Sequence, residues 1–139
     1  MNTPIMLALL ALVTGGMARF AWKIAGTHSA AYGPSYMVVE TIAFVSVAIV
    51  IHLVQRHPFE LSSKMTGLAL LGGALAGITV FSLLLAFRLG GQGTVIYPIG
   101  GMSVIVAVIL SSVFYREPIT FTKIVGLGLG VSSIIVLSR

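Results

Sequence analysis

Five long apolar segments, separated by short loops, constrain this chain more than any other feature of its sequence. Each segment is close to the roughly 20 residues that an α-helix needs to cross the hydrocarbon core of a bilayer. The loops are too short to hold a soluble domain, so the backbone polar groups must be satisfied within helices. We therefore expect an all-α, polytopic membrane protein with one transmembrane domain, residues 1–139, and five spans at about residues 4–24, 34–54, 65–87, 94–115 and 121–137.

The composition agrees with a bilayer environment and excludes several classes of site. Charged residues make up 8% of the chain, whereas a soluble protein has about 25%, so a water-exposed surface is not expected. The net charge of +5 does not indicate nucleic-acid binding, because the basic residues are scattered at segment ends, where they anchor helices at lipid headgroups. The chain has no cysteine and no histidine–carboxylate set at ligand spacing, so we expect no metal and no other cofactor. No nucleophile motif is present, and we do not expect an enzyme.

The positive charges show no bias between the two sides of the membrane. Five spans place the termini on opposite sides. The side of the N-terminus carries Arg56, Lys64, Arg116 and Lys123, and the other side carries Arg19, Lys23, Arg88 and Arg139. Because the distribution of lysine and arginine between short loops sets orientation, four against four predicts no preferred direction of insertion. If Arg19 lies within the membrane, the count becomes four against three.

Glu40 lies inside the second apolar segment, where a carboxylate is costly. The other two acidic residues, Glu60 and Glu117, are in loops. Glu40 is about 6 Å from the centre of its segment, and a charged group there costs roughly 2.5–3.5 kcal/mol on insertion scales. Three interpretations are open: an ion pair with Arg19, which has a matching depth in the first segment; exposure to a transport cavity, where the carboxylate binds a proton or a cation; and snorkelling from a lipid-facing position.

Aromatic residues accompany this carboxylate. Tyr36 is four residues before Glu40 and shares its helix face, an arrangement that suits a cation through charge and ring-face attraction. Trp22 is a further candidate for the substrate route, although Trp22 and Tyr32 also fit the aromatic belt at a membrane interface. We expect the substrate-binding residues to be Glu40, Tyr36, Tyr97, Arg19, Ser103 and Trp22.

Small residues at a spacing of four suggest close helix packing in two segments. Gly73 and Gly77 lie in the third segment, and Gly126 and Gly130 lie in the fifth. Lipid provides no hydrophobic drive for helix pairing, so small residues matter because they let backbones approach. We expect the first pair to pack within the chain and the second to form a dimer contact, although glycine is also common in membrane helices. Pro98 is expected to break the fourth segment, either beside a cavity or as an ordinary kink.

The second half of the sequence contains short motifs in a fixed order. They are AFRLG at Ala86–Gly90, IYPI at Ile96–Ile99, REPIT at Arg116–Thr120 and a glycine-spaced final segment from Gly126. In this order they resemble the second half of an EamA domain of the drug/metabolite transporter superfamily. The N-terminal half fits through a Gly-Gly pair and Lys23 in the first segment. The resemblance implies a multi-pass transporter of the cell membrane with an EamA-like helix bundle.

Typical members of that superfamily have two five-helix repeats in inverted orientation, whereas this chain resembles one repeat alone. Together with the unbiased charges, the resemblance implies an antiparallel homodimer that moves a small metabolite or an amphipathic or cationic compound by alternating access, with proton exchange as a hypothesis. The essential Glu of the small multidrug resistance branch lies in its first helix, so its role is not transferred to Glu40. The alternatives are a subunit of a heteromeric transporter or flippase, and a structural or assembly protein without transport activity.

Overall fold

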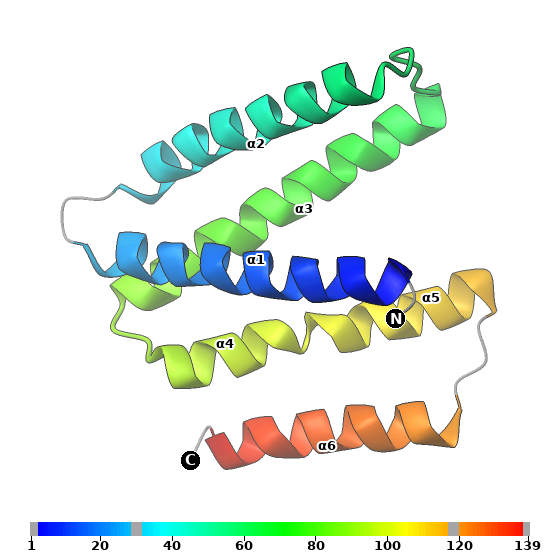
Figure 1. Cartoon of the computed structure of the whole chain (residues 1–139). Helices are drawn as coiled ribbons and strands as arrows, with labels where there is room; N and C mark the ends of the chain where they lie inside the picture. The colour runs from blue at the N-terminus through cyan, green and yellow to red at the C-terminus, as the bar shows by residue number, and fades with distance from the viewer. Residues whose placement is uncertain (1–2, 29–31, 117–119, 138–139) are drawn as a thin grey trace. The chain divides into compact units, whose positions relative to one another are not determined.

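The structure is a computed structural model that describes residues 3–28, 32–116 and 120–137, apart from the side chains at positions 134 and 137. Glu117, Pro118 and Arg139, which the sequence analysis used, lie outside these ranges. All regular elements in the described ranges are α-helices (Figure 1). The helices are α1 (Thr3–Thr27), α2 (Gly33–Gln55), α3 (Ser63–Arg88), α4 (Gly93–Gly101), α5 (Ser103–Tyr115) and α6 (Phe121–Leu137).

Among the described residues, four stretches are long and apolar enough to cross a membrane. They are α1, α2, α3 and the combined stretch Gly93–Tyr115, which comprises α4 and α5. The apolar helix α6 is shorter, and its 17 residues extend over about 26 Å at 1.5 Å per residue. The expectation of an all-α, polytopic membrane protein is confirmed, and the helix ends lie within three residues of the expected span ends.

Serine and threonine side chains show how polar groups are accommodated on these apolar helices. In the described part of the chain, eight hydroxyls each donate a hydrogen bond of 2.7–3.1 Å to the backbone carbonyl oxygen one turn earlier. A hydroxyl satisfied in this way does not need water, so it tolerates a lipid environment. The residues are Thr14, Thr27, Thr41, Ser46, Thr66, Thr79, Ser82 and Ser132.

The chain forms two compact units, Met1–Gly90 and Gly91–Arg139. In the N-terminal unit, α1 packs most extensively on α3, and α2 also packs on α3. Leu84 and Phe87 of α3 are 3% and 1% exposed and are the buried hydrophobic residues of the described chain. The core of this unit therefore lies where the end of α1 meets the end of α3, and most other large apolar side chains face outward.

Gly26 allows this packing. A methyl group at Gly26 would lie 2.8 Å from the carbonyl oxygen of Leu84 and 2.8 Å from Cβ of Phe87, so the two backbones approach each other directly. The pair expected to pack within the chain contributes less. A methyl group at Gly77 would lie 3.8 Å from Cε of Met37 on α2, and nothing lies within 4 Å of one at Gly73.

In the C-terminal unit, α6 packs along α4 (Figure 1). The fourth expected span is divided at Met102, which separates α4 from α5, while Pro98 lies inside α4. Proline cannot donate a backbone hydrogen bond, and the Met102 N–H donates to the carbonyl oxygens of Pro98 and Ile99 at 3.2 and 3.1 Å. The interruption is therefore one turn beyond the proline.

Replacing Gly26 with alanine is expected to destabilise the N-terminal unit. The added methyl group meets backbone and Cβ atoms that cannot move aside without displacing a helix, and overpacking of this kind costs about 1–3 kcal/mol. The higher helix propensity of alanine offsets less than about 1 kcal/mol of this cost. Thermal unfolding of the purified protein in detergent should therefore have a lower midpoint.

Gly16→Ala provides the matched control on the same helix, because nothing lies within 4 Å of a methyl group at that position. This variant should be as stable as the unaltered protein or slightly more so. Equal midpoints for Gly26→Ala and Gly16→Ala would contradict the close approach of α1 and α3.

Candidate functional site

A hydrogen bond between Trp22 and Glu40 joins α1 to α2. Nε1 of Trp22 donates to Oε1 of Glu40 at 2.5 Å, and both side chains are half-buried. The indole N–H thus satisfies one oxygen of a carboxylate that has few other donors in an apolar segment. The bond also links α1 to α2 at this depth.

Sequence reasoning expected both residues in the site but not the bond between them. Trp22 is five residues before the end of α1, and Glu40 is seven residues after the start of α2. These positions are about 8 Å and 11 Å from the end that the two helices share. Counting residues from the helix ends matched the depth of Glu40 with that of Arg19. The same count would also have matched Glu40 with Trp22.

Arg19 lies one turn before Trp22 and is half-buried. Residues three apart share a helix face, so Arg19 and Trp22 lie on the same side of α1. The ion pair between Arg19 and Glu40 stays a prediction.

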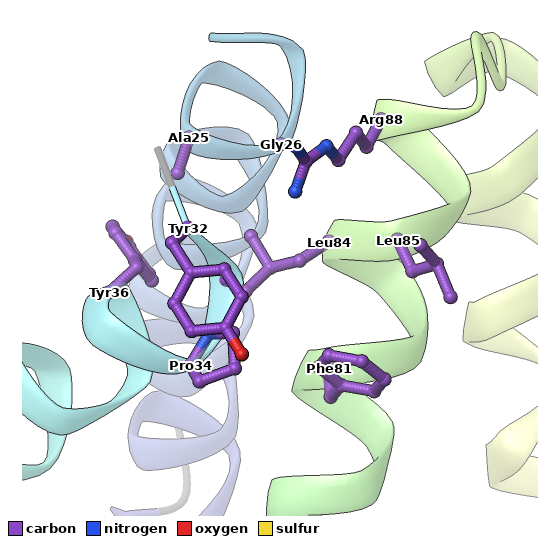
Figure 2. A pocket seen from close by; sticks show the side chains of 10 residues that line it. Ala25, Gly26, Tyr32, Pro34, Tyr36, Phe81, Leu84, Leu85 and Arg88 are labelled. Carbon is purple, nitrogen blue, oxygen red and sulfur yellow. The ribbon is translucent and has the colours of Figure 1, made fainter. Parts of the chain in front are cut away.

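Tyr36 lies one turn before Glu40 on α2 and lines a pocket, which we call the end pocket (Figure 2). The end pocket lies where α1 ends, α2 begins and α3 ends, and its volume is about 190 Å³. Figure 2 shows Arg88 reaching from the end of α3 toward Gly26. The lining residues are Ala25, Gly26, Tyr32, Gly33, Pro34, Tyr36, Phe81, Leu84, Leu85 and Arg88.

A second hollow, which we call the α2–α3 groove, adjoins the end pocket. It has a volume of about 480 Å³, and it shares Pro34 and Phe81 with the end pocket. Its lining residues are Pro34, Met37, Val38, Thr41, Ile42 and Phe81. Sequence reasoning named neither hollow. The signal for the end pocket was an arginine at the end of an apolar segment, which alone is typical of a membrane anchor.

The other expected site residues belong to the C-terminal unit. Tyr97 and Pro98 are half-buried in α4, and Ser103 is exposed at the start of α5. The structure therefore brings Trp22, Tyr36 and Glu40 together in the N-terminal unit. The other three residues belong to the C-terminal unit. Their roles in substrate binding stay predictions.

The two glycines of α6 have different surroundings. A methyl group at Gly130 would lie 3.8 Å from the sulfur of Met102, so part of this glycine face is used within the chain. Nothing lies within 4 Å of a methyl group at Gly126. Gly126 instead lines a groove of about 520 Å³ between α5 and α6, together with Ser111, Ser112 and Lys123. The dimer contact stays a prediction.

Within residues 3–28, 32–116 and 120–137, no three histidine or acidic side chains are grouped as a metal site would require. His52 instead packs edge-on against Phe59, with ring centroids 5.8 Å apart and an angle of 84° between the rings. This histidine thus has a packing role at the end of α2.

Comparison with known proteins gives the family. Residues 2–139 match the EamA-like transporter family. The chain belongs to this family. An uncharacterized protein of Methanocaldococcus jannaschii, MJ1333.1, is 27% identical to it over 139 residues, which cover 99% of this chain and 98% of the relative. No solved structure matches the chain.

Membership of the EamA-like transporter family agrees with the apolar helices described above. This EamA-like chain is accordingly a multi-pass membrane protein of the drug/metabolite transporter type. The match covers nearly the whole chain, in agreement with the resemblance to a single EamA repeat.

Replacing Glu40 with glutamine is expected to change the fluorescence of Trp22, which is the only tryptophan in the chain. The carboxylate places a negative charge at the pyrrole end of the indole ring, and this charge favours red-shifted emission because the excited state moves electron density toward the benzene ring. The neutral amide should therefore shift the emission of the purified protein to shorter wavelength.

Glu60→Gln is the matched control, because it removes a carboxylate from the loop between α2 and α3 and should leave the emission unchanged. Identical spectra for Glu40→Gln and the unaltered protein would show that the indole and the carboxylate are not bonded in the folded protein.

Proposed function

We propose that this EamA-like protein transports a small molecule with a cationic group across the membrane, by alternating access between the two copies of an inverted homodimer. The observation that carries this proposal is the half-buried carboxylate of Glu40, held by Trp22 and one turn from Tyr36. Ionisable groups at this depth in transporters usually face a substrate or ion pathway. Membership of a transporter family supports the same conclusion.

The chemistry of these three side chains suits a cation. Glu40 supplies a negative charge, and the rings of Trp22 and Tyr36 supply negative faces that attract a cation within about 6 Å of their centres. A cation bound at the carboxylate would add to or replace the indole hydrogen bond. A small amphipathic amine is therefore the substrate class that fits.

Proton exchange is the coupling that this arrangement favours. A proton and a cationic substrate would compete for one carboxylate, so the release of one allows the binding of the other. Competition at a single site links the two fluxes without a second ionisable group. Transport driven by an imposed proton gradient follows from this scheme.

Two arguments support the inverted homodimer: the distribution of lysine and arginine along the chain, and the resemblance of the chain to one EamA repeat. If all five apolar segments cross the membrane, the lysine and arginine residues divide four against four between its sides, or four against three if Arg19 lies within the membrane. A chain with so little bias has no preferred orientation. The chain matches the family over its full length as one EamA repeat. Two opposed copies would supply the second repeat.

The Trp22–Glu40 bond also favours a second candidate function. If this bond is permanent, its role is to tie α1 to α2 and to satisfy a half-buried carboxylate. The chain would then be a structural or assembly protein that transports nothing. Flux measurements separate the two functions.

Replacing Glu40 with glutamine is expected to abolish proton-coupled transport. Protein reconstituted into liposomes that contain a pH-sensitive dye should release protons when an amphipathic cation such as ethidium is added, and the variant should not. Glu60→Gln should behave like the unaltered protein, because its carboxylate is in a loop. Unchanged proton release in Glu40→Gln would remove this residue from the mechanism, and no release from the unaltered protein would favour the structural function.

The antiparallel dimer is expected to place Gly126 of one copy beside Gly130 of the other, since these residues are equally distant from the midpoint between them. The chain has no cysteine, so single substitutions give clean cross-linking. A mixture of Gly126→Cys and Gly130→Cys chains in membranes should form mixed dimers on oxidation. Gly126→Cys alone should form few, whereas a parallel pair would cross-link through this variant alone.

Orientation provides the independent control for this experiment. A cysteine added at either terminus should be labelled from both sides of the membrane by a reagent that does not cross the bilayer. Labelling of each terminus from one side only would contradict the inverted dimer, although it would leave the Glu40 chemistry intact.

A further inference from the structure

The end pocket contains a positive charge without a counter-charge. Of the ten residues that line it, Arg88 is basic and none is acidic. Within the described part of the chain, the Arg88 guanidinium makes no hydrogen bond or ion pair. The neighbouring wall is apolar and aromatic and includes Phe81, Leu84 and Leu85 (Figure 2). This combination selects a ligand with an anionic group and an apolar body.

The position of the end pocket determines the depth in the membrane at which that anionic group would lie. α1 ends at Thr27, α2 begins at Gly33 and α3 ends at Arg88, so all three helices terminate around it. These helices are long enough to cross the bilayer, and their ends therefore lie at the level of the lipid headgroups. The Arg88 guanidinium is thus at the depth of lipid phosphates.

The α2–α3 groove extends from the end pocket along α2. The two hollows share Pro34 and Phe81, and from Pro34 to Ile42 the groove runs for about 12 Å along the helix. Its remaining residues are apolar except Thr41, whose hydroxyl already donates to the carbonyl oxygen of Met37 at 2.8 Å. The groove therefore offers no free polar group and suits an alkyl chain.

We propose that the end pocket and the α2–α3 groove together bind one anionic phospholipid, with its phosphate at Arg88 and an acyl chain along the groove. The volume of about 190 Å³ is below the roughly 300–1,000 Å³ of a drug-sized site, so the end pocket fits a headgroup phosphate rather than a whole amphiphile. Tyr32 and Tyr36 line the same pocket and supply hydroxyl donors. This site goes beyond the proposed transport and does not depend on Glu40.

The test is lipid binding to the full-length protein, measured by native mass spectrometry during release from detergent. Phosphatidylglycerol and phosphatidylcholine with identical acyl chains are the probes, because they differ in headgroup charge. Both lipids carry the phosphate, but the ammonium of phosphatidylcholine cancels its charge and repels the guanidinium. The unaltered protein should therefore bind phosphatidylglycerol at least about tenfold more tightly, and Arg88→Gln should lose this preference. Arg88→Lys should retain part of it.

Arg56→Gln is the matched control for charge, because Arg56 is an exposed arginine that follows α2 at the opposite end of the N-terminal unit. It should keep the preference for phosphatidylglycerol. An equal loss in Arg56→Gln and Arg88→Gln would overturn the proposal, since it would show a general attraction to basic helix ends. If Arg88→Gln does not fold, the unaltered protein decides the matter: equal binding of the two lipids overturns the proposal.

The groove requires its own variant. Thr41→Phe would fill the groove and should weaken the binding of both lipids, whereas Ser46→Phe, on the same helix beyond the groove, should not. Glycerol 3-phosphate is the probe for a soluble phosphate. If it binds as tightly as phosphatidylglycerol, or if Thr41→Phe binds lipid normally, the ligand is not a lipid with its chain in the groove and the proposal is wrong.

Discussion

The structure of this chain depends on one constraint: backbone polar groups in a hydrocarbon environment must be satisfied within their own helix. This constraint accounts for the helical structure of the described residues and for the hydroxyls that bond to their own backbone one turn earlier. The hydrocarbon environment also removes the hydrophobic drive that forms a core in a soluble protein, because lipid tails are as apolar as leucine. Among the described residues, few large side chains are therefore buried, and those that are lie at one helix crossing.

The helices must then associate by direct contact, and they do so where a side chain is missing. Gly26 brings the backbone of α1 against that of α3 beside Leu84 and Phe87. This contact places the ends of α1, α2 and α3 around the end pocket. The Trp22–Glu40 bond lies about one to two turns deeper in the same unit. The Gly26 crossing, the Trp22–Glu40 bond and the α2–α3 groove are therefore neighbouring features at one end of a three-helix unit.

The lengths of the apolar segments predicted most of the fold, because the hydropathy of each segment indicates by itself whether that segment forms a membrane helix. The span ends agree with the helices within three residues, and the depth of Glu40 follows from the same count. Contacts between helices were harder to predict because they depend on helix rotation, which sequence spacing leaves free. Gly73 and Gly77 have the right spacing, yet the close approach is at Gly26. The bond from Trp22 to Glu40 was missed for the same reason. The helix break was expected at Pro98 and is found at Met102, which separates α4 from α5.

The crossing at Gly26 also has a mechanical consequence for any movement of α1. The backbones of α1 and α3 approach most closely at Gly26, so a tilt of α1 would take this crossing as its pivot. The crossing is close to one end of α1, and about 35 Å of helix extends beyond it at 1.5 Å per residue. A tilt of about 10° at this fulcrum would swing the far end of α1 through about 6 Å, so a small change near the polar site is amplified on the opposite side of the membrane.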